Sequence, residues 1–86
     1  MPKISEFFGI SIYIYYREHL PPHFHAIYGG DEASIEIDNL SLLSGRLTPR
    51  AMGLVMEWAS LHQEDLRHVW EQAKSHEALD KIEPLK

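Results

Sequence analysis

A strict alternation of isoleucine with polar and aromatic residues limits what this chain can fold into more than any other feature. Ile10, Ile12 and Ile14 stand at every second position, and successive side chains of a β-strand point to opposite faces of a sheet. This period, in β-branched and aromatic residues, predicts a half-buried strand whose isoleucines face the core. Pro21 and Pro22 end the strand, because a proline donates no hydrogen bond to a neighbouring strand.

The first half of the chain contains further segments of the same kind. Residues 23–28 alternate two histidines with apolar residues, and Gly29-Gly30 supplies the turn of a tight hairpin. We therefore expect an antiparallel β-meander of three to four strands within about residues 3–43. The other segments with strand character are residues 33–37, the short run 40–43 and, as an additional N-terminal strand, 4–8.

The second half of the chain has the period of a helix. Thr48 is a favourable N-cap, and Pro49 suits the first helical position. One helix of about 27 residues would be about 40 Å long, whereas a compact chain of this length is about 30 Å across. We therefore expect two helices within about residues 48–76, with a break at His62. The helical stripe consists of Met52, Val55, Ala59, His62, Leu66, Val69 and Ala73.

Strands followed by helices predict an α+β fold with two layers, in which the two C-terminal helices pack on one face of the sheet. If the isoleucines face the helices, the opposite face or its rim carries Tyr13, Tyr15, Arg17, His23 and His25. Candidate functional residues are therefore concentrated on the side of the sheet away from the helices.

Composition restricts the class of protein further. Eighty-six residues, of which 44% are hydrophobic and 24% charged, predict a single globular domain over residues 1–86. The chain has no cysteine, which excludes disulfides and cysteine-ligated zinc, and we expect a cytoplasmic protein. No apolar run reaches signal-peptide length or the about 18 residues of a membrane helix, so we expect no membrane association.

The net charge of −5 argues mildly against wholesale nucleic-acid binding, but the charge is uneven. Residues 13–28 contain three histidines, four tyrosines and Arg17 against the single acid Glu18. We therefore expect the functional residues to lie in this segment.

Three histidines surround the two prolines of this segment. A His-x-His pair on a strand places His23 and His25 on one face, about 6.5 to 7 Å apart at Cα. That spacing suits one divalent transition metal such as zinc, provided that a third ligand converges, and His19 or Glu18 is placed to supply it. A purely structural interpretation also accounts for the pattern: His23 opens a strand, His25 packs against a tyrosine, and His19 is a solvated turn residue.

Metal-free acid and base chemistry on a phosphodiester is a further alternative. Such a site needs one group to take a proton, another to return it, and a cation to stabilise the developing charge. The candidate catalytic residues are Arg17, His19, His23 and His25. Exposed tyrosines also stack on bases, and tyrosine and arginine are typical of protein interfaces. The candidate binding face consists of Tyr13, Tyr15, Arg17 and Arg46.

The central motif resembles a known bacterial family. Residues 15–29 contain YYREHxPPHFHAxYG, preceded by ISxFFGI at residues 4–10 and followed by EWAxLH at residues 57–62 and by Trp70. This combination is similar to the family known as domain of unknown function number 4160. The resemblance implies a small cytoplasmic protein, often encoded beside a second small protein in an arrangement similar to toxin–antitoxin modules. It implies no catalytic residues.

Two functions from different classes follow. The first is an interaction component of a toxin–antitoxin-like two-gene module, which forms a homo-oligomer or binds a small partner protein encoded nearby. The second is a histidine-dependent hydrolase, with a ribonuclease as the leading example, metal-assisted or metal-free. Whether the protein is an enzyme is left open by the sequence. Converging imidazoles of His23 and His25 would favour the hydrolase, and diverging rings would favour the interaction component.

Overall fold

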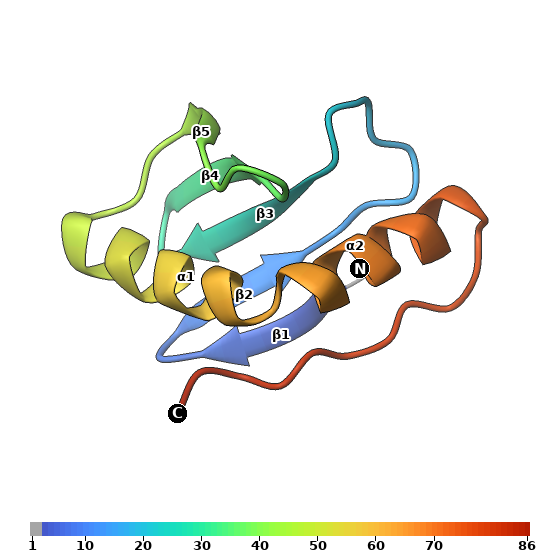
Figure 1. Ribbon diagram of the computed structural model, residues 1–86. Coiled ribbons are helices and arrows are strands. Elements are labelled where there is room, and N and C mark those ends of the chain that lie inside the picture. Colours follow the sequence, from blue (N-terminus) through green and yellow to red (C-terminus); the bar gives the residue numbers. More distant parts are fainter. Residues whose placement is uncertain (1–2) are drawn as a thin grey trace.

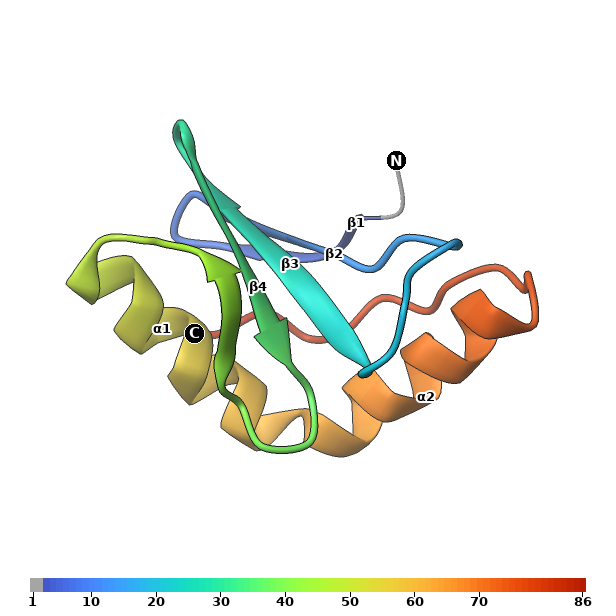
Figure 2. The same ribbon diagram turned by 90° about the horizontal axis from the view of Figure 1, so that it is seen from above.

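The computed structural model describes residues 3–86, so the first two residues of the expected domain lie outside the described part. It shows a five-stranded antiparallel sheet with two helices across one face (Figures 1 and 2). The strands follow one another in the order β1-β2-β3-β4-β5, so the sheet is the expected meander. The elements are β1 (Lys3–Phe7), β2 (Ile10–Tyr13), β3 (His23–Tyr28), β4 (Asp31–Glu36), β5 (Leu42–Gly45), α1 (Pro49–Leu61) and α2 (Gln63–Lys74).

The expected α+β class is confirmed, but the expected three to four strands are corrected to five. The N-terminal strand is irregular because the register with β2 shifts between Lys3 and Ser5, which leaves Ile4 and Ser5 both buried. A bulge of this kind interrupts the period of two on which sequence prediction relies. The last strand also extends to Gly45, two residues beyond the expected limit.

The core lies between the sheet and the helices. Ile10, Ile12 and Ile14 are each at most 1% exposed, which confirms their predicted orientation. Trp58 of α1 is fully buried and packs against Phe7, with ring centroids 5.3 Å apart. The strand β2 itself is shorter than the alternation suggested, because the chain leaves the sheet after Tyr13 and begins the long loop to β3.

The C-terminal segment runs back along β1 and covers its outer edge (Figure 1). The backbone N–H of Ile82 donates to the carbonyl oxygen of Ile4 at 2.8 Å, and the indole N–H of Trp58 donates to the carbonyl oxygen of Glu83 at 2.8 Å. The β1 edge of the sheet is therefore closed by the chain's own tail.

The predicted break between the helices is confirmed at His62, which separates α1 from α2 with φ at −129°. Thr48 is the N-cap of α1, as predicted, and its Oγ1 accepts a hydrogen bond from the backbone N–H of Ala51 at 3.2 Å. The molecule measures 33 × 25 × 23 Å, which an unbroken helix of about 40 Å would exceed. Neither helix in residues 3–86 has the length and apolar character needed to span a membrane.

Two glycines of the chain give opposite predictions for stability. At Gly45, φ is +76°, and an added Cβ would lie 2.0 Å from the carbonyl oxygen of Glu32, a backbone atom that cannot move aside. At Gly53, inside α1, an added Cβ would meet no atom within 4 Å. We expect Gly45→Ala to lower the free energy of unfolding by about 2 kcal/mol or more, and Gly53→Ala to raise it by about 1 kcal/mol.

Urea unfolding of both variants beside the unmodified protein measures these changes. Equal stability of the Gly45→Ala variant and the unmodified protein would contradict the close approach of β5 to Glu32. A large loss for Gly53→Ala would contradict the open space on α1.

Candidate metal centre

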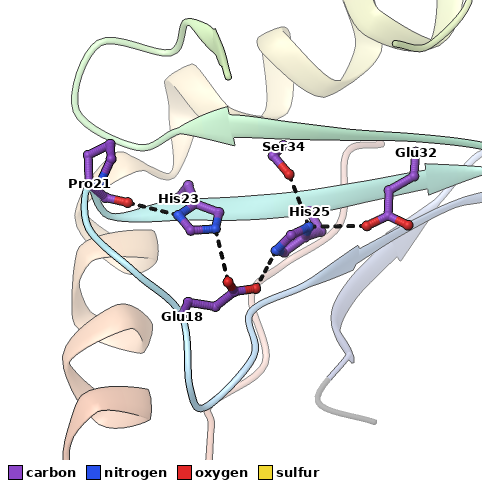
Figure 3. Close-up of polar contacts among 6 residues, drawn as sticks. All are labelled: Glu18, Pro21, His23, His25, Glu32 and Ser34. Carbon is purple, nitrogen blue, oxygen red and sulfur yellow. Dashed lines mark hydrogen bonds and ion pairs between the residues drawn. The ribbon is translucent and has the colours of Figure 1, made fainter. Parts of the chain in front are cut away.

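The strand β3 holds two histidines on one side. His23 and His25 occupy alternate positions, and Phe24 between them points to the opposite side, where it is fully buried in the core. The loop of residues 14–22 leaves β2 and turns back over the histidines, which brings Glu18 beside both rings (Figure 3). The cluster is thus built from one strand and the loop that precedes it.

The carboxylate of Glu18 contacts both imidazoles. Its Oε1 lies 2.5 Å from Nε2 of His25, and its Oε2 lies 3.4 Å from Nε2 of His23. One potential ligand atom from each of the three residues falls within 4.8 Å of the others. The two rings therefore converge on a common point, with centroids 5.1 Å apart.

The other ring nitrogen of each histidine is held by an acceptor (Figure 3). Nδ1 of His23 lies 2.8 Å from the carbonyl oxygen of Pro21, which can only accept, so this nitrogen carries the proton and donates it. Nδ1 of His25 lies 3.2 Å from Oε2 of Glu32 and 3.2 Å from Oγ of Ser34. A carbonyl or carboxylate behind the outer nitrogen is the usual arrangement of a metal-binding histidine.

These contacts restrict what can occupy the centre of the cluster. A neutral imidazole has one N–H, so His25 cannot donate to both Glu18 and Glu32. The contact with Glu18 is made either by a ring that donates through Nε2 and accepts at Nδ1 from the hydroxyl of Ser34, or by a ring whose Nε2 proton is replaced by a cation. In the neutral tautomers, the Nε2 lone pairs of His23 and His25 and the carboxylate of Glu18 form a set of three ligands for a divalent ion.

Aromatic rings surround the cluster. Tyr15 lies 4.7 Å from His25 between ring centroids and is stacked on Tyr13 at 5.9 Å, while Trp70 of α2 lies 5.5 Å from His23. Burial raises the pKa of the Tyr15 phenol, and the negative charge of Glu32 raises that pKa further. The phenol therefore stays protonated at neutral pH. The His23, His25 and Glu18 side chains keep 10%, 12% and 19% of their surface exposed, so the cluster is shielded yet open to solvent.

The structure brings together only some of the residues predicted from the sequence. His23 and His25 meet as expected, with Tyr13 and Tyr15 beside them. The third group is Glu18, whereas His19 points into solvent and belongs to no cluster of potential ligands among residues 3–86.

The two predicted arginines lie apart from one another. Arg17 is exposed in the same loop as Glu18, without an ion pair to any described residue. Arg46 follows β5 and lines a hollow with Asp31 and Thr48, whereas His23 and His25 form a cluster with Glu18. The chain crosses from the sheet to α1 at this point, and the place of Arg46 in the binding face stays a prediction.

Glu32 and Ser34, which fix His25, were not predicted as site residues. His25 pairs with Ser34 across the β3–β4 hairpin. Glu32 lies on β4, two residues before Ser34. Counting back from the turn at Gly29-Gly30 would have placed both on the histidine side of the sheet, because residues two apart share a face.

Comparison with known proteins identifies one family. The model of the family described as domain of unknown function (DUF4160) matches residues 9–71, a stretch that includes the whole candidate metal centre. No curated protein and no solved structure matches the chain.

Proposed function

Because the chain belongs to the DUF4160 family, whose description names no activity, we propose its function from the site itself. The protein is a metal-dependent hydrolase that holds a divalent transition ion, such as zinc, between Glu18, His23 and His25. The observation that carries the proposal is the convergence of one ligand atom from each residue within 4.8 Å. Diverging rings would have favoured the interaction component.

The ligand set is typical of catalytic metal centres. Two histidines and a carboxylate provide three protein ligands and leave a coordination position for water or substrate. Pro21 and Glu32 hold the outer ring nitrogens, which orients both imidazoles toward the ion. A bound ion of this kind supplies an activated water and stabilises negative charge on a phosphate.

We infer a phosphodiester of RNA as the substrate class. The stacked rings of Tyr13 and Tyr15 lie beside the cluster and are partly exposed, so they offer a surface on which bases stack. Arg17, in the loop that carries Glu18, supplies a cation for the phosphate. In the hydrolysis, the oxygen of water bonds to phosphorus, the bond from phosphorus to the leaving ribose oxygen breaks, and one water proton ends on that oxygen. We propose the cytoplasm as the compartment, since the family resemblance implies a small cytoplasmic protein.

Metal binding is tested on protein first stripped with a chelator and then titrated with zinc. We expect about one ion per chain by elemental analysis and calorimetry. Glu18→Gln and His25→Ala each remove a ligand and should weaken binding by more than about tenfold. His19→Ala is the matched control, because that histidine is one residue from Glu18 but lies in solvent. Binding that survives Glu18→Gln and is lost in His19→Ala would refute the ligand set.

Hydrolysis is tested by incubating the zinc-loaded protein with a fluorescent single-stranded RNA. We expect cleavage that stops when a chelator is added and returns with zinc, and that is absent from the Glu18→Gln variant. Arg17→Gln should slow cleavage without changing the amount of zinc bound, because Arg17 is placed to bind the phosphate and not the ion. RNA that stays intact with fully loaded protein would contradict the hydrolase.

A second proposal, of an interaction component, rests on the other edge of the sheet. The tail covers β1, but within residues 3–86 no strand pairs with the outer side of β5, and its four residues are all exposed and uncharged. Leu42 and Leu43 are 48% and 42% exposed. An uncharged, uncovered edge is suited to pairing with another chain. We propose that a second copy, or the small partner of a toxin–antitoxin-like two-gene module, adds a strand here.

Light scattering after gel filtration tests this second proposal. Leu43→Lys introduces a charge on the edge and should convert a dimer, or a complex purified from the native host, into the monomer. Leu61→Lys is the control, because Leu61 is 67% exposed at the end of α1 and is not part of the β5 edge. A protein that is monomeric at high concentration and recovers no partner from its host would contradict the proposal.

A further inference from the structure

A hollow distinct from the one lined by Arg46 lies at the end of β3 opposite to the metal centre. It is a groove of about 220 Å³ between the β1–β2 turn, the last residue of β3 and the first turns of α1. Its apolar walls include the rings of Phe8 and Tyr28 and the side chain of Leu54, and its polar groups include Thr48 and Arg50. This volume is below the roughly 300 Å³ of pockets for drug-sized ligands, so the groove suits one small, ring-bearing group.

Phe8 occupies a backbone position that disfavours a bulky residue. Phe8 and Gly9 form the two-residue turn between β1 and β2, with φ values of 50° and 79°. Two-residue turns with both φ values positive favour Asn followed by Gly, since Asn tolerates the left-handed region far better than phenylalanine. Phe8 is also 58% exposed, so burial in the core does not offset the strain. Strain of this kind persists mainly at functional positions.

Tyr28 faces the same groove from the end of β3. Its ring lies over Gly9, where an added Cβ would be 3.5 Å from Cε1 of the tyrosine, and 39% of Tyr28 is exposed. The β1–β2 turn therefore presents Phe8 on the same groove as the ring of Tyr28. Two partly exposed aromatic rings offer the faces on which a flat ligand stacks.

The polar side of the groove carries uncompensated positive charge. Arg50 is exposed and forms no ion pair with any residue of the described chain, and the first turn of α1 has no acidic residue. Arg46 lies with Asp31 in an adjoining hollow that shares Thr48 with the groove. The hydroxyl of Thr48 accepts from Ala51, so its own proton is free to donate to a ligand. Because the residues that line the groove include Arg50 and no acid, its polar side favours an anionic group.

We propose that the groove binds a nucleotide, with the base against Phe8 and Tyr28 and the phosphate on Arg50. Aromatic side chains stack on every base, and a guanidinium pairs with phosphate oxygens through two parallel hydrogen bonds. A free nucleotide and one unit of a single-stranded RNA offer the same chemistry. The groove is separated from His23 by the length of β3, about 17 Å, and its proposed binding does not depend on the metal centre or on hydrolysis.

The test is an amide NMR titration of the full chain in the presence of a chelator, with AMP, adenosine, inorganic phosphate and a short oligoadenylate as probes. We expect AMP to shift the signals of Phe8, Tyr28, Arg50 and Leu54, and to bind more tightly than adenosine or phosphate alone. Tighter binding of the oligoadenylate than of AMP would identify single-stranded RNA as the source of the nucleotide, and equal binding would identify the free nucleotide.

Three variants make the test decisive. Phe8→Asn keeps the turn and relieves its strain, so it should unfold at the same or a higher temperature while its Kd for AMP rises at least about fivefold. Arg50→Gln should raise the Kd by a similar factor and reduce its dependence on salt. Lys74→Gln, at the far end of α2, removes the same charge and should leave the Kd unchanged.

Unchanged affinity of both groove variants would overturn the proposal. So would AMP shifts confined to the residues around His25, or no shifts at millimolar AMP. Because a chelator is present throughout, a failure of zinc binding or of RNA cleavage would leave this result unaffected.

Discussion

The antiparallel pairing of β3 with a strand on each side is the constraint on which the rest of the structure depends. Ile12 pairs with Ala26 on one side, and Ala26 pairs with Ala33 on the other, so the apolar positions of three strands form one surface beneath the helices. The same register places Tyr13 opposite His25 and His25 opposite Ser34. Because a shift by one residue would exchange the two faces of β3, the hydrophobic core also fixes the orientation of the histidines.

Both proposed sites lie at ends of β3 where a turn or loop adds one side chain to a rigid frame. The loop before β3 contributes Glu18 to the histidines, and the β1–β2 turn contributes Phe8 to the groove. Neither residue packs in the core, so their positions follow from loop geometry rather than from hydrophobic burial. This division is common, because loops vary without loss of the scaffold that holds them.

Much of the fold could be predicted from the sequence because it follows local rules. The alternation of Ile10, Ile12 and Ile14, the cap at Thr48 and the break at His62 each reflect a period, a capping hydrogen bond or a limit of size. The irregular strand β1 was expected only as an additional segment over residues 4–8, since its bulge buries Ile4 and Ser5 in succession. A strict period of two does not predict two consecutive buried residues.

The candidate site was predictable only in part, for a related reason. The spacing of His23 and His25 on one strand fixes their common face. The third ligand comes from a loop, where Glu18 and His19 point in different directions and no period distinguishes them. Glu32 and Ser34 depend on the exact register of the β3–β4 hairpin, which a short turn sets but composition does not.

X-ray absorption spectroscopy of the zinc-loaded protein tests the central claim most directly. Ligation by Glu18, His23 and His25 predicts a first shell of nitrogen and oxygen atoms at about 2.0 to 2.2 Å, with the multiple-scattering signature of two imidazoles. The Glu18→Gln variant should lose this spectrum. A spectrum of hydrated zinc without imidazole scattering would show that the two rings converge on Glu18 for structural reasons alone and would contradict the account.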